Sequence, residues 1–136
     1  MAIINPFPEL IAYAPYATTI LRLVMGLYFI YLGYKNFATY KKELYNFFES
    51  IDLPYPLYAV DVLAILEIIC GIFLILGFLT QITCIVTILI AVVSLVASID
   101  HKDIGLRSRS TYAFLFAISL TLIFTGAGMF SVDSPL

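Results

Sequence analysis

The chain has 136 residues, of which 62% are hydrophobic and 12% are charged, and its net charge is −2. A soluble domain of this size cannot bury so much apolar surface in one core, so the composition indicates an integral membrane protein with a single domain, residues 1–136. The small negative charge excludes the basic surface with which proteins bind nucleic acid, whereas a lipid bilayer is the expected surroundings.

The first apolar segment predicts a membrane span over residues 16–34. Residues 1–10 contain no Lys or Arg, so the basic start of a signal peptide is missing and we expect this segment to remain as an anchor. Within it, Arg22, Gly26, Phe29 and Gly33 follow one another at spacings of four, three and four, which places them on one helix face. The two glycines would let another helix approach closely.

The next segment, residues 35–56, is too charged to span a membrane. Apolar side chains recur in it at helical spacing, with charged residues between them. This pattern is typical of an amphipathic helix that lies on the membrane surface between the first and second spans.

Residues 68–99 contain no charged side chain. A single helix of that length would measure about 48 Å, longer than the hydrocarbon layer of about 30 Å. The segment must therefore turn back, and residues 77–81, with a glycine and two polar side chains close together, are the expected turn. This predicts spans at about 57–78 and 81–99. A fourth apolar segment predicts a span at about 110–130, so the fold class is an all-α, integral membrane four-helix bundle.

Lysine and arginine placement predicts the orientation. Six of these residues lie in the two longer connections: Lys35, Lys41, Lys42, Lys102, Arg107 and Arg109. The expected turn and both termini hold none. The positive-inside rule therefore places both connections in the cytoplasm and both termini outside, in a multi-pass protein of the inner or plasma membrane.

Several residues have an ordinary structural interpretation. The thiols of Cys70 and Cys84 are expected to be buried, inert and at depths too different for a disulfide. The single histidine, His101, lies at an interface and is not expected to bind a metal, so no metal site is predicted. The small polar stripe on the third span is expected to be a helix-packing seam; it comprises Thr83, Thr87, Ser94 and Ser98.

Charges within a membrane are costly, so their positions are informative. Arg22 is the one cation well inside a predicted span, and Glu67 lies near the middle of another. Their expected depths differ by about 7 Å, within reach of the two side chains. Two interpretations remain open: an ion pair that sets the register of spans one and two, or a polar pocket for a ligand head group or a proton. Asp61, about 120° around the helix from Glu67, is expected to reach water or Lys35.

The chain resembles the DoxX family of small four-span membrane proteins. The resemblance lies in Arg22-x-x-x-Gly26-x-x-Phe29-x-x-x-Gly33-x-Lys35 in the first span and in Glu67-x-x-x-Gly71 in the second. It continues in the closing segment Gly126-Ala127-Gly128-Met129-Phe130-Ser131-x-Asp133, in which Met129 stands where the family commonly has a basic residue.

The resemblance implies a four-helix bundle, with Arg22, Glu67 and Asp133 as its polar centre and Gly26, Gly33 and Gly71 at helix contacts. It also implies a link to membrane oxidoreductase systems that handle quinones, thiols or sulfur compounds. We expect a non-catalytic accessory subunit of such a system, with quinone as the cofactor and a soluble or membrane oxidoreductase as the partner. Two alternatives are a small proton-coupled transporter acting as a homodimer, with Glu67 carrying the proton, and an assembly factor for other membrane helices.

Overall fold

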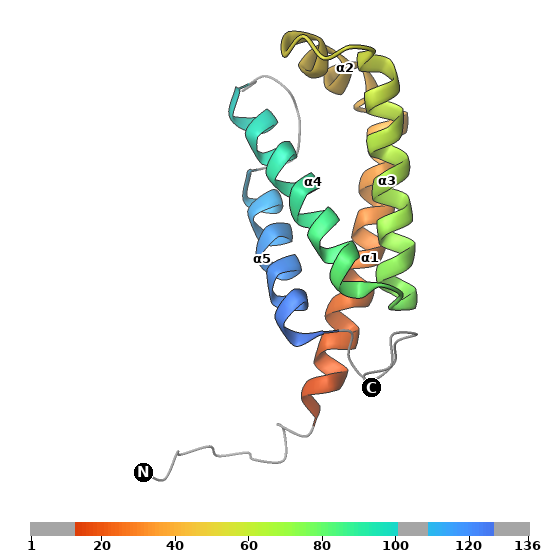
Figure 1. The fold of residues 1–136 in the computed structure, drawn as a ribbon, viewed down its shortest axis with the longest axis vertical. Helices are drawn as coiled ribbons and strands as arrows, with labels where there is room; N and C mark the ends of the chain where they lie inside the picture. Colours follow the sequence, from red (N-terminus) through yellow and green to blue (C-terminus); the bar gives the residue numbers. More distant parts are fainter. Residues whose placement is uncertain (1–12, 101–108, 127–136) are drawn as a thin grey trace.

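The protein is an all-α chain in a computed structural model that describes residues 13–100 and 109–126. These residues form five helices (Figure 1): α1 Ala14–Ala38, α2 Lys41–Ser50, α3 Pro56–Leu76, α4 Thr80–Asp100 and α5 Arg109–Thr125. Two stretches are long and apolar enough to cross a membrane, Tyr16–Ala38 of α1 and Pro56–Leu76 of α3. The predicted helical class is thus confirmed, and the first two predicted spans form helices that are long and apolar enough to cross a membrane.

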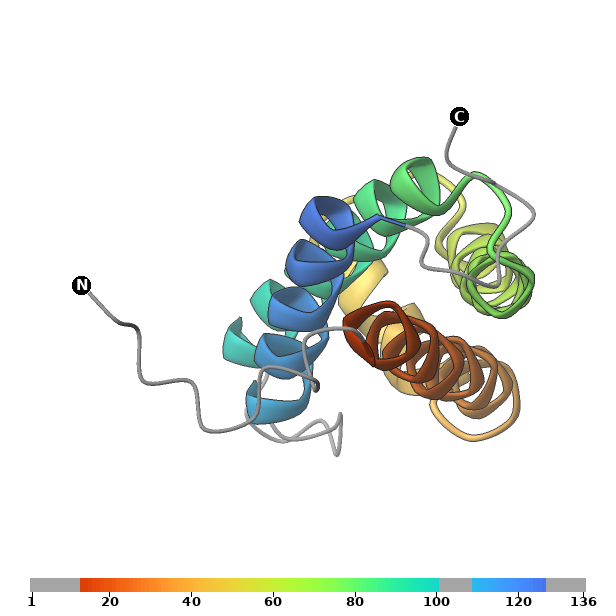
Figure 2. The ribbon, with the colours of Figure 1, turned by 90° about the horizontal axis from the view of Figure 1, so that it is seen from below.

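The helices associate mainly as two pairs. α1 packs along α3, and α4 packs along α5, while α3 meets α4 and α1 meets α5 less extensively. Figure 2, a view along the helices, shows each pair side by side, with α5 placed next to α1. The buried core between the pairs draws side chains from four helices: Met25, Phe29, Leu32, Leu74, Cys84, Ile90, Ala91, Tyr112, Leu115 and Leu122.

The turn between α3 and α4 falls in the segment where the sequence predicts it. Gly77 has a left-handed backbone with φ 66°, a conformation that costs a residue with a Cβ atom more than it costs glycine. The Gly77 N–H donates to the Leu74 carbonyl and the Phe78 N–H to the Phe73 carbonyl, as in a Schellman motif. The rings of Phe73 and Phe78 meet edge to face at 5.7 Å, which supplies the apolar contact of that motif.

The segment between α1 and α3 contains a shorter helix than the sequence indicates. α1 continues beyond Tyr34 to Ala38, and the short helix α2 occupies only Lys41–Ser50. α2 buries Leu44, Phe47 and Phe48 against Val60 of α3. Figure 1 shows α2 lying across the end of the α1–α3 pair.

Asp61 is about one third exposed and so reaches water, as one of the two expectations has it, but its ion-pair partner is not Lys35. Its carboxylate forms an ion pair of 2.6 Å with the ammonium group of Lys41, and both side chains are about one third exposed. Lys41 reaches Asp61 because it is the first residue of α2, which folds back onto α3, whereas Lys35 lies inside α1 and its ammonium group is above the ring of Tyr31.

Candidate functional site in the α1–α3 interface

The backbones of α1 and α3 touch at three glycines. A Cβ atom added to Gly26 would lie 2.7 Å from the Gly71 carbonyl oxygen, and one added to Gly71 would lie 2.6 Å from the Gly26 carbonyl oxygen. A Cβ atom on Gly33 would lie 2.6 Å from the Ala64 carbonyl oxygen. No side chain fits at these distances, so the three glycines allow the two antiparallel helices to pack directly, backbone against backbone.

Close packing at Gly33 brings together two buried polar side chains. The Asn36 amide nitrogen donates a hydrogen bond of 2.7 Å to the Glu67 carboxylate. Asn36 is 3% exposed and Glu67 is 1% exposed. The contact follows from helix geometry, because side chains lean toward the N-terminus of their own helix and those of Asn36 and Glu67 therefore lean toward each other. α1 and α3 are thus joined by a polar contact deep in an apolar interface.

Arg22 is also buried, with 1% of its surface exposed, but it lies at another level of the interface. Gly26 and Gly71 face each other. Arg22 precedes Gly26 by four residues and Glu67 precedes Gly71 by four. Because the two helices are antiparallel, Arg22 and Glu67 lie on opposite sides of the glycine contact along the bundle. At the helical rise the two charged residues are about 12 Å apart along the bundle, not the expected 7 Å. The difference arises because glycine packing, and not the ends of the spans, sets the register.

The direct contact between Arg22 and Glu67 stays a prediction. Each side chain leans toward the start of its own helix, and in antiparallel neighbours at these positions the two therefore lean apart. On the α4 side, Arg22 lies close enough to the Cys84 thiol to interact with it electrostatically. Asp133, the third member of the predicted polar centre, lies outside the described residues, as does His101.

A second polar contact joins α4 to α5. The Thr87 and Ser119 hydroxyl oxygens are 3.0 Å apart, and both residues are completely buried. Thr83 is buried as well, and its hydroxyl donates to the Leu79 carbonyl at 3.0 Å. These contacts agree with the helix-packing seam expected for the small polar residues of α4. Ser98 lies in α4, but its side chain is outside the described part.

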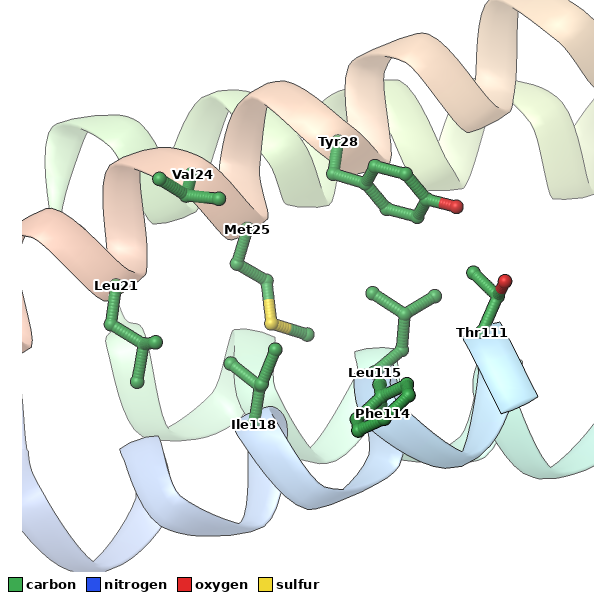
Figure 3. A pocket seen from close by; sticks show the side chains of 8 residues that line it. All are labelled: Leu21, Val24, Met25, Tyr28, Thr111, Phe114, Leu115 and Ile118. Carbon is green, nitrogen blue, oxygen red and sulfur yellow. The ribbon is translucent and has the colours of Figure 1, made fainter.

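An apolar groove runs between α1 and α5, and Figure 3 shows it from close by. Its volume is about 260 Å³, and we call it the α1–α5 groove. Half of its lining comes from each helix: Leu21, Val24, Met25 and Tyr28 of α1, and Thr111, Phe114, Leu115 and Ile118 of α5. Arg22 and Glu67 do not line it, because they belong to the face of α1 and α3 that forms the interface between those two helices.

The comparison with protein families decides the family of the chain. The model of the family described as DoxX matches residues 17–99, which is more than half of the sequence. The chain belongs to the DoxX family. Comparison with curated proteins and with solved structures gives no match.

The DoxX match contains the α1–α3 interface described above. Its range includes Arg22, Asn36 and Glu67 as well as the three packing glycines, and it ends before α5. Together with the two apolar helices, membership of the DoxX family indicates a small membrane protein.

Asn36 is the polar residue of this DoxX interface that the sequence analysis misses. It continues the spacing of Arg22, Gly26, Phe29 and Gly33 by three more residues, so the helix periodicity contains the necessary signal. The expected span ends at residue 34 because Lys35 looks like a membrane boundary. In the structure α1 continues for four further residues and carries Asn36 into the interface.

Proposed function

We propose that this DoxX protein is a non-catalytic accessory subunit of a membrane oxidoreductase system and that it holds a quinone beside the polar residues of the α1–α3 interface. In this proposal α1, α3, α4 and α5 cross the membrane of the cell, α2 lies at its cytoplasmic surface, and both termini are outside. The 21 residues of α4 measure about 32 Å, enough to cross a layer of about 30 Å, and the 17 residues of α5 measure about 26 Å, at the lower limit of roughly 17–25 residues for a span.

The observation that carries the proposal is the burial of Asn36 and Glu67 against each other inside two apolar helices. A charged or strongly polar side chain at membrane depth is costly, and such residues commonly belong to sites for ligands, ions or protons. An apolar contact at the same place would hold the two helices together equally well or better. A quinone carbonyl is a hydrogen-bond acceptor that amide or guanidinium donors in this interface, from Asn36 or Arg22, can bind.

The experiment is to purify the chain gently from its membrane and measure quinone per chain by mass spectrometry. Glu67→Gln, Asn36→Leu and Arg22→Gln should each lower the retained quinone, while Thr87→Val, at the other buried polar contact, should leave it unchanged. Circular dichroism and size-exclusion profiles identify variants that fail to fold. Wild-type protein without quinone, or equal retention in all folded variants, would refute the proposed role.

A second candidate function is proton-coupled transport, which the environment of Glu67 favours. Glu67 is a buried carboxyl group inside an apolar helix, and carboxyl groups in such positions commonly belong to proton relays. Vesicles that contain the full chain and an enclosed pH indicator would then carry a proton flux across an imposed gradient. Glu67→Gln should abolish that flux, and a flux equal to that of empty vesicles would exclude this function.

The proposed topology has its own test. Lys42→Cys and Ser110→Cys should react with a membrane-impermeant maleimide from one side only, and Gln81→Cys from the other. All three positions are exposed, while the natural Cys70 and Cys84 are buried and should give little background. Labelling of positions 42 and 81 from the same side would contradict the four-span arrangement.

A further inference from the structure

The Asn36 side chain has one polar atom that its contact with Glu67 does not use. The amide nitrogen donates to the Glu67 carboxylate at 2.7 Å, and the planar amide group therefore turns its oxygen away from Glu67. This oxygen is buried, and it accepts no hydrogen bond from the described part of the chain. A buried acceptor without a donor is costly, so its position in the interface favours a ligand that supplies one.

The orientation of the amide group follows from the chemistry of Glu67. A carboxylate only accepts hydrogen bonds, so it faces the amide nitrogen of Asn36 and not the oxygen. The contact between the two side chains thus uses one donor of Asn36 and leaves its acceptor for another molecule. The free acceptor determines which chemical groups this part of the interface binds best.

Asn36 lies at a level of the bundle that suits the polar ring of a lipid-soluble molecule. Tyr34 of α1 and Tyr58 of α3 are 64% and 71% exposed, and exposed tyrosines are typical of the membrane–water interface. Asn36 is two residues from Tyr34, which is about 3 Å along the helix. In the membrane placement proposed above, the amide is therefore close to the interface, where a ring with hydroxyl groups is less costly than in the middle of the hydrocarbon layer.

The oxidised and reduced forms of a quinone differ in the hydrogen bonds that they make. A quinone has only carbonyl acceptors, whereas the hydroxyl groups of a quinol both donate and accept. We propose that the α1–α3 interface binds the quinol in preference to the quinone, with one quinol hydroxyl donating to the Asn36 amide oxygen. This inference rests on the proposed quinone role and names the redox form that the site selects. One additional hydrogen bond predicts a preference of about fivefold.

The test compares the affinities of the full chain for two redox forms of one probe. The protein in phosphatidylcholine nanodiscs is dialysed to equilibrium against duroquinone in one series and against durohydroquinone, without oxygen, in another. Uptake by empty nanodiscs is subtracted, because both forms dissolve in lipid. We expect the dissociation constant for durohydroquinone to be about fivefold lower than that for duroquinone.

Three variants assign the preference to the Asn36 oxygen. Asn36→Leu keeps a side chain of similar size without the amide, and it should make the two dissociation constants equal. Arg22→Gln should not lower the preference, because a guanidinium group donates to an oxygen of either form. Thr87→Val, at the buried contact between α4 and α5, should leave both constants unchanged. Circular dichroism identifies any variant that does not fold, and the wild-type preference tests the inference without the variants.

The outcomes separate this inference from the proposed function. Equal affinity for the two forms, or tighter binding of duroquinone, would overturn the preference for quinol and leave the accessory role in place. A preference that persists in folded Asn36→Leu would overturn the assignment to the Asn36 oxygen. Binding of neither form would overturn both the inference and the proposed quinone role.

Discussion

The Asn36 amide donates a 2.7 Å hydrogen bond to the Glu67 carboxylate, and in their own helices the two residues lie three positions after Gly33 and Ala64, whose backbones touch. The short distance between the helix backbones and the polar contact depend on each other. Without a side chain at Gly33 the helices approach, and the approach brings a short amide side chain within reach of the carboxylate. The interface therefore combines close packing with a specific polar contact.

Loss of this hydrogen bond should destabilise the protein. Asn36→Ala removes the donor and leaves the Glu67 oxygen with one fewer partner, so we expect the free energy of unfolding to fall by about 1–2 kcal/mol. Asn46→Ala, at an exposed position of α2, is the matched control and should have little effect. Denaturant titration in detergent micelles compares the two, and equal stabilities would mean that the Asn36 contact contributes nothing.

A methyl group at the glycine contact should separate α1 from α3. In Gly26→Ala the added carbon would lie 2.7 Å from the Gly71 carbonyl oxygen, a backbone atom that moves only with its helix. Overpacking of this kind typically costs about 1–3 kcal/mol. Thermal unfolding should therefore occur at a lower temperature in Gly26→Ala than in the wild type. Ala117→Val adds bulk at an exposed position of α5 and should leave the midpoint unchanged, so equal shifts in both variants would count against direct backbone packing.

The ion pair between Lys41 and Asp61 should hold α2 on α3 only weakly. Both side chains are about one third exposed, and such pairs usually contribute less than about 1 kcal/mol because water and salt screen them. Lys41→Ala should increase protease cleavage near α2 modestly, and the increase should shrink at high salt. Lys42→Ala, at the exposed neighbouring position, is the control. The exchange Lys41→Asp with Asp61→Lys should restore the wild-type cleavage rate, and no recovery would argue against the pair.

The hydroxyl contact between Thr87 and Ser119 should couple α4 to α5. A double-mutant cycle with Thr87→Val and Ser119→Ala isolates this contact, and hydrogen bonds between membrane helices give coupling energies of about 0.6 kcal/mol, up to roughly 1.7. Thr125→Val serves as the control, because that exposed hydroxyl donates to Thr121 of its own helix. A coupling energy of zero would reduce the 3.0 Å contact to simple proximity.

Local chemistry made much of this fold predictable from the sequence. The uncharged stretch of residues 68–99 is longer than one span can hold, and Gly77 lies close to two polar residues within it. The turn between α3 and α4 therefore follows from length and local residue preference. The spacing of Gly26 and Gly33 likewise predicts a close helix contact, and the structure pairs them with α3. What the spacing could not provide was the register of that contact, which places Arg22 about 12 Å from Glu67 along the bundle.

The sequence by itself determined the all-helical class, the apolar character of the first two predicted spans and the face of α1 that meets another helix, because each depends on residues close together in the chain. Only the tertiary structure decided that Asn36 binds Glu67, that Lys41 binds Asp61 and that a groove opens between α1 and α5. Each of these depends on how far one helix slides along another before backbone atoms touch. That distance is set by shape at the interface, which a one-dimensional pattern of residues does not contain.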